Sequence, residues 1–447
     1  MSPDEWKALG KELQFTSVEP VNGYVGKLYS NQRAVAAWLH EQGRLHTPQG
    51  KPSEEAVAEL LQMAWPFKTS EASDLLDLVQ SEIDKTLSAP WKSEELPPLA
   101  TWLQRNHTQL DLLVEASKRP RLYSPDASFL VDPEADLFSY SSSDFLWTTS
   151  EIRYALASSA MWHLGEGRHR EAWDNLFAIL RWSRLIGQNP SLTEKLRAHA
   201  FEDTAQASLV ALIEDKNLPP ELARKIARDL ASMQPVVQFA DAFDEMERFH
   251  FIHMVILIHK EGAGTFLSYF DRDDESATQV LNHVSFDWNV VLQRGNNWYD
   301  RISAAFKLPN HDDRERELTV LDSELQTLSD QVRSPGVWLQ IAINRRRRSE
   351  TLAAALITEF QLPLLRLLAI EDQAASRLQG LHLATALAAY RAEHGEYPER
   401  LNQLVPEILS KLPELHSAES LVYQRDGDSY ILSSGGNDLV HESAEVP

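Results

Sequence analysis

The chain has 447 residues, 43% of them hydrophobic, so it is long enough to form two or three domains with buried cores. Its 43 Lys and Arg against 66 Asp and Glu leave a net charge of −23, and such a surface repels phosphate backbones, so we expect no nucleic-acid partner. The absence of cysteine excludes disulfides, thiolate metal sites and cysteine nucleophiles.

The sequence has no pattern typical of a membrane span or an export signal. No apolar run reaches the roughly 18 residues that cross a bilayer, and the longest, 249–258, is interrupted by His250 and His253. The first residues lack the basic-then-apolar order of a signal peptide. We therefore expect no transmembrane segment. The protein is expected either in the cytoplasm or, after removal of an export signal, in the periplasm or cell envelope.

Residues 1–144 are predicted to form an N-terminal helical region with Pro-rich linkers. Proline removes a backbone donor and biases the preceding residue away from helix, so clusters such as 90–98 mark helix boundaries. The segment 118–144 holds three prolines and a serine-rich run without helical periodicity. We place the first domain boundary there.

Residues 145–362 are predicted to form a central helical array, and the clearest unit is a helical hairpin at 152–186. Apolar residues recur at helical spacing on both sides of a turn at 165–172. This turn resembles that of a tetratricopeptide hairpin, but no second copy follows at about 34 residues, so we expect no regular repeat. The predicted fold is mostly α, an array of α-solenoid-like hairpins.

Residues 363–447 are predicted to form a small α+β module. A long helix begins at Pro363 and ends before Gly395, as helix termini prefer. Two short strands, 420–424 and 429–433, flank an Asp-Gly turn and predict an antiparallel hairpin. A further turn is expected at Gly435, Gly436, Asn437 and Asp438.

The order of an Ala-rich helix, a Gly-x-Tyr-Pro corner and a hairpin resembles the soluble domain of type II secretion pseudopilins. The matching helix and corner residues are Leu387, Tyr390, Gly395, Tyr397 and Pro398. The apolar N-terminal assembly helix of that family is missing, so we expect no polymerisation. The calcium loop of that family is reduced to 435–438 with Glu442 nearby, too few ligands for a calcium site that needs six to eight oxygens.

Residues 102–120 and 165–182 resemble helical envelope proteins of unknown function, common in planctomycete-like bacteria, that end in such a module. The resemblance implies no enzymatic activity, and no Walker loop, Gly-x-Ser-x-Gly or His-Glu-x-x-His motif is present. We expect a non-catalytic, envelope-associated scaffold with a protein partner and no cofactor. Deletion of 372–447 is then expected to leave the helical body folded.

A metal-dependent enzyme is one alternative, centred on Glu247, His250 and His253. These residues recur every three positions, and Glu-x-x-His is the spacing of di-iron helical bundles. Against a metal site, steps of three residues drift by about 60° around a helix, so satisfied core or surface residues are the competing interpretation.

A glycan or peptide binder is another alternative, with Trp288 and Trp298 as stacking platforms and Asn296 and Asn297 as a polar rim. Ordinary packing of the two tryptophans is the competing interpretation.

One dense basic run could bind an acidic partner, a phosphate or an anionic lipid. It consists of Arg345, Arg346, Arg347 and Arg348. Because four consecutive residues span a full helical turn, a solvated helix surface is the competing interpretation.

Overall fold

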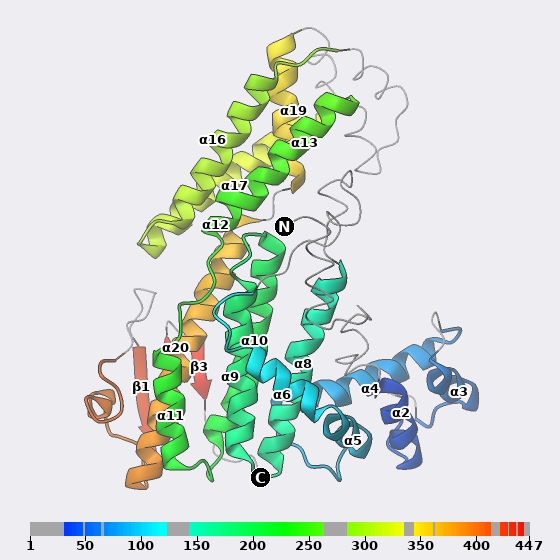
Figure 1. The fold of residues 1–447 in the computed structure, drawn as a ribbon, viewed down its shortest axis with the longest axis vertical. Helices are drawn as coiled ribbons and strands as arrows, with labels where there is room; N and C mark the ends of the chain where they lie inside the picture. Colours follow the sequence, from blue (N-terminus) through cyan, green and yellow to red (C-terminus); the bar gives the residue numbers. More distant parts are fainter. Residues whose placement is uncertain are drawn as a thin grey trace, which may run out of the picture.

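The computed structural model describes residues 31–47, 50–63, 67–122, 143–262, 284–334, 344–360, 363–412, 421–427, 429–434 and 437–441. In this part of the chain, helices form two lobes along the long axis of the molecule (Figure 1). A small antiparallel sheet lies beside the lower lobe. The predicted mostly α fold with a small C-terminal α+β module is confirmed.

The lower lobe contains the N-terminal helices and the predicted hairpin. Ser53 and Thr69 cap two of these helices, since their hydroxyl oxygens accept hydrogen bonds from the first turns. The predicted hairpin is confirmed as α8 and α9, and these two helices, which are consecutive in the sequence, share one hydrophobic core. The helices of this lobe are α2 (Gln32–Glu41), α3 (Glu54–Gln62), α4 (Ser70–Ser88), α5 (Pro97–Arg105), α6 (His107–Ala116), α8 (Ser143–Gly165), α9 (His169–Ile186), α10 (Leu192–Glu214) and α11 (Pro220–Ala231).

The upper lobe has a separate hydrophobic core. Gly295 allows α16 to approach α13 closely, because a Cβ at this position would overlap the ring of Phe251. A π-helical turn precedes α13. The elements of this lobe are α12 (Ala240–Ala242), η3 (Phe243–Glu247), α13 (Arg248–Glu261), α16 (Trp288–Phe306), α17 (His311–Arg333) and α19 (Arg345–Phe360).

One long helix, α20 (Leu364–His394), belongs to both lobes (Figure 1). Leu364, Leu367 and Leu368 lie in the upper core, whereas residues between 381 and 389 lie in the lower core. The domain boundary predicted at 362/363 therefore does not coincide with a boundary between the two cores, because residues of α20 belong to both. The lobes are joined by a continuous helix rather than by a linker.

The C-terminal module begins where Gly395 ends α20 in the left-handed conformation, with φ of 79°. After η4 (Leu401–Leu404), the strands β1 (Leu421–Asp426), β2 (Ser429–Ser434) and β3 (Asn437–His441) pair antiparallel in that order. Tyr397 packs edge-to-face on Tyr430 of β2, with ring centroids 4.8 Å apart. Both rings belong to the lower core, so the module is part of the lobe rather than an appendage.

The predicted hairpin is confirmed, and β2 and β3 pair antiparallel on either side of the turn predicted at 435–438, although two of its four residues already belong to β3. Asn437 and Asp438 pair with Ser434 and Ser433 as the start of β3, because the sheet continues beyond the hairpin. Gly435, Gly436 and Glu442 lie outside the described residues.

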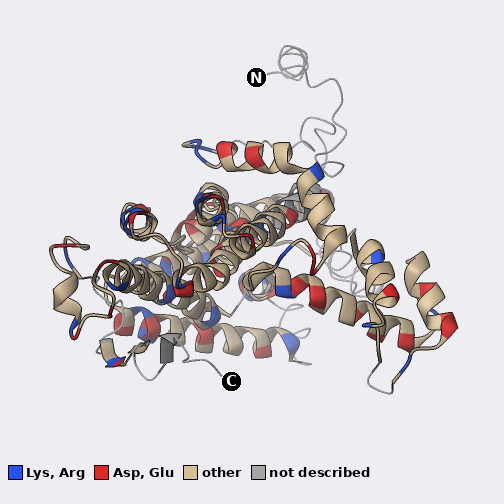
Figure 2. Cartoon of the chain, turned by 90° about the horizontal axis from the view of Figure 1, so that it is seen from below, with Lys and Arg blue, Asp and Glu red and all other residues tan. Residues whose placement is uncertain are grey.

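One stretch within the described part of the chain, Arg345–His394, has the length and apolar composition of a spanning helix. Its leucines and alanines supply much of both cores, as expected of a core helix. The chain thus has no clear membrane-spanning segment in its described residues. Charged residues of both signs are interspersed along the helices (Figure 2).

Candidate functional site

The four arginines of the basic run do not form one anion-binding surface. Arg345 donates to the carbonyl of Phe286 at 2.8 Å, and Arg348 donates to the carbonyl of Ser285 at 2.9 and 3.0 Å. These two side chains hold the segment that leads into α16. Arg346 and Arg347 are exposed, and Arg346 pairs with Glu350 four residues along at 3.2 Å.

Two of the three residues of the metal-binding interpretation, Glu247 and His250, are in contact with each other. Glu247 ends the π turn, and its Oε2 lies 3.6 Å from Nδ1 of His250. Its other oxygen accepts from the Leu192 amide at 3.1 Å, which ties α10 to this turn. Within the described ranges, no group of three or more His, Asp or Glu residues is placed to hold a metal ion, so His253 does not complete a site.

The four residues of the predicted glycan or peptide groove are divided between two places. Trp288 packs against Phe286 and His259 at the start of α16, with centroids 5.4 and 5.2 Å apart. Trp298, almost three turns later, lines a groove together with Asn297. Trp288 and Asn296 do not line it, because Trp288 lies ten residues earlier along α16 and Asn296 lies on the side of α16 opposite to Trp298.

This groove, with a volume of about 520 Å³, lies between α16 and α17. Its walls combine apolar side chains with short hydroxyl side chains. Val320 on α17 is 45% exposed although it is apolar, whereas Trp298 is 5% exposed. An ion pair between Arg301 and Glu324, at 2.6 and 2.8 Å, connects the two helices. The lining residues are Arg294, Asn297, Trp298, Arg301, Thr319, Val320, Ser323, Glu324, Thr327, Leu328 and Ile357.

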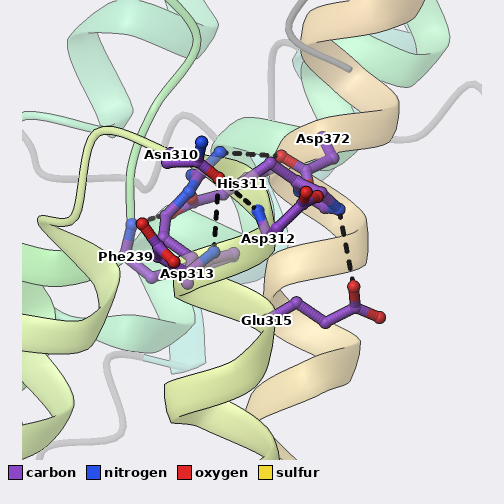
Figure 3. A network of polar contacts seen from close by, with 9 residues as sticks. Phe239, Asn310, His311, Asp312, Asp313, Glu315 and Asp372 are labelled. Atoms are coloured by element: carbon purple, nitrogen blue, oxygen red, sulfur yellow. Dashed lines mark hydrogen bonds and ion pairs between the residues drawn. The ribbon is translucent and has the colours of Figure 1, made fainter. Parts of the chain in front are cut away.

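A polar network that the sequence analysis did not identify lies where the two lobes meet. His311, in the first turn of α17, is 2.9 Å from Asp372 of α20 and 3.9 Å from Glu315 (Figure 3). Asn310 caps α17 by accepting from the amides of Asp312 and Asp313. The network therefore joins the start of α17 to the first third of α20.

Two charged residues at the centre of this junction are more than nine-tenths buried. Arg314 is 8% exposed and Glu371 is 4% exposed. The guanidinium of Arg314 lies 3.2 Å from Asp372 and 3.6 Å from Glu371. Glu371 also accepts a hydrogen bond from the Phe239 amide, at the entrance to the upper lobe. These contacts partly compensate the cost of burying the charges.

Burial raises the pKa of Glu371 to about 7, although the hydrogen bond from Phe239 and the charge of Arg314 act in the opposite direction. A carboxyl group with such a pKa exchanges its proton near neutral pH. Burial also lowers the pKa of His382, which lies about three turns further along α20. Both residues line a cavity of about 370 Å³ between α11 and α20. The junction can therefore bind or release a proton between the lobes.

The sequence contains a signal for only one half of this junction. Glu371 and Asp372 interrupt a run of leucines and alanines in the long predicted helix, a pattern that indicates a buried polar position. Arg314 lies in a strongly charged stretch, 311–317, where nothing distinguishes it from its exposed neighbours. Its pairing with α20 depends on the tertiary structure.

No protein-family model, curated protein or solved structure matches this chain.

Proposed function

We propose that the protein is a non-catalytic scaffold that binds a helical segment of a partner protein in the groove between α16 and α17. The observation that carries this proposal is the open groove that exposed Val320 on α17 and buried Trp298 on α16 line together. The resemblance of the C-terminal module to pseudopilins motivates a further part of the proposal, that the scaffold works at the cell envelope.

The surface of α17 suits the close approach of another helix. Thr319, Ser323 and Thr327 recur every four residues and line the groove with small side chains. Each hydroxyl donates to the carbonyl four residues earlier, at 2.7 to 2.9 Å. Their donors are thus used within α17, and the groove can accept an apolar helix face without leaving these donors unsatisfied.

The rim favours a partner helix with an acidic residue beside its apolar face. Arg294 is exposed at the rim and has no ion pair with another described residue. A carboxylate placed there by the partner forms a charge-assisted contact. Leu328 and Ile357 provide the apolar surface for the leucine or similar anchor of the same helix.

Site-specific photo-crosslinking tests the proposal. A photoreactive residue at Thr327 is expected to capture a partner in the host cell, and one at Gln326, which does not line the groove, is not. A peptide that covers the crosslinked segment should then bind the purified protein as a helix. Ser323→Trp, which fills the groove, should weaken this binding by at least about tenfold, or 1.4 kcal/mol.

Two results would overturn the proposal. One is equal capture from positions 327 and 326, and the other is a peptide whose affinity is unchanged by Ser323→Trp. The four residues of the glycan alternative are divided between two places, and no group of three His, Asp or Glu in the described residues is placed to hold a metal ion, so the geometry favours neither alternative.

A further inference from the structure

A second cavity, in the lower lobe and remote from the groove, is lined by an unusual number of cationic side chains. Its volume is about 810 Å³, and it lies between the α8–α9 turn, α11 and the segment that follows η4. The cationic side chains are Arg168, Arg170, Arg224, Lys225 and Arg228. They outnumber the lining carboxylates five to three, in a chain with a net charge of −23.

Three of these five cations are held in place by neighbouring side chains, Lys225 through an ion pair with Asp229. Arg168 donates from Nε to Nδ1 of His163 at 2.8 Å, and its guanidinium lies over the ring of Trp162, 4.5 Å from the centroid. Burial lowers the pKa of His163 to about 4, so this imidazole is a neutral acceptor. Arg224 is bound by both oxygens of Glu393. The wall is therefore preorganised, which reduces the entropy lost on binding.

Two other cations remain available to a ligand. Arg170 and Arg228 are exposed, and neither forms an ion pair with another described residue. They lie on different elements, α9 and α11, on the same cavity. A multiply charged anion between them can accept charge-assisted hydrogen bonds from both guanidinium groups.

The backbone adds to this positive potential. Both α9 and α11 begin at the cavity, and neither N-cap residue, Arg168 or Pro219, has a side chain that accepts from the first turn. The N-terminal end of each helix carries a partial positive charge that favours an anion. The charged side chains and the helix ends therefore act in the same direction.

We infer that this cavity is a binding site for a small phosphorylated molecule with at least two anionic groups. No Trp, Tyr or Phe side chain is among the lining residues, and the one imidazole, that of His169, is bound to Asp215, so the ligand is recognised by its phosphates rather than by stacking of a base. The cavity is larger than a single phosphate requires, which favours a diphosphate or a sugar bisphosphate. The negative net charge repels extended polyanions, whereas a small anion needs only this local site.

Isothermal titration calorimetry of the full chain with inorganic pyrophosphate, at constant ionic strength, tests the inference. The Arg170→Gln, Arg228→Gln double variant is expected to weaken pyrophosphate binding by at least about tenfold. The matched control is Arg316→Gln, Arg346→Gln, which removes the same charge from exposed positions outside the cavity and should bind like the wild type. Thermal denaturation verifies that both variants are folded.

Three outcomes would overturn the inference. The first is that neither phosphate nor pyrophosphate binds the wild-type protein. The second is an equal loss in the cavity variant and in the charge-matched control, which would indicate a diffuse electrostatic effect. The third is that an acidic peptide binds in the cavity more tightly than pyrophosphate does, which would assign the site to a protein segment instead.

Discussion

The substitution Glu371→Gln at the lobe junction is expected to make the protein more stable at alkaline pH and to leave it almost unchanged at acidic pH. Glutamine keeps an oxygen that can accept from the Phe239 amide, and it removes only the negative charge. The carboxyl group of Glu371 is 4% exposed, so solvent screening is weak at this position.

The sign follows from the pKa of Glu371, which is raised from 4.5 to about 7. Between these values the folded protein retains this proton whereas the unfolded chain loses it. The proton on Glu371 therefore stabilises the folded protein fully below pH 4.5, and this stabilisation is lost as the pH rises through 7. The pKa difference of Glu371 between the unfolded and the folded protein corresponds to about 3 kcal/mol in the free energy of unfolding.

Urea denaturation of wild type and variant between pH 4.5 and 8.5 measures this difference directly. Other buried groups, such as His199 with a pKa lowered to about 4, change the stability of both proteins equally, so the difference between the two curves isolates Glu371. We expect the variant to gain about 3 kcal/mol over the wild type across this range. Glu315→Gln, which removes an exposed carboxyl from the same network, is the control. Parallel curves for wild type and Glu371→Gln would refute the reasoning.

Two further predictions follow from the cores. Truncation after His394 should unfold the lower lobe, because it removes apolar side chains that together contribute more than about 5 kcal/mol to the free energy of unfolding. This result is the opposite of the sequence-based expectation that the C-terminal module is independent. An unchanged melting temperature, measured by circular dichroism, would contradict the prediction. The side chains lost from the lower core are Tyr397, Leu404, Leu409, Tyr430 and Leu432. Gly295→Ala should destabilise the upper lobe by about 1 to 3 kcal/mol, because the added methyl group meets Phe251. The double variant Gly295→Ala, Phe251→Leu should recover part of the lost stability. An unaltered denaturation midpoint for Gly295→Ala alone would show that the two helices separate without an energetic cost.

The sequence by itself determined the local structure. Apolar spacing predicted the hairpin at 152–186, and Gly395 marked the end of the long helix because it has no Cβ to oppose a positive φ. The Asp-Gly turn predicted the strands β1 and β2 for the same reason, with Gly427 at φ of 57°. These features depend on residues within a few positions of one another.

Only the tertiary structure decided which distant side chains meet. Trp288 and Trp298 share a helix but point into different surroundings, and the arginines at 345 and 348 bind carbonyl groups some sixty residues earlier. Arg314 reaches Glu371 because α17 and α20 are packed side by side at the junction. Such pairings depend on how whole helices pack, and helical periodicity specifies which face is buried but not which helix covers it.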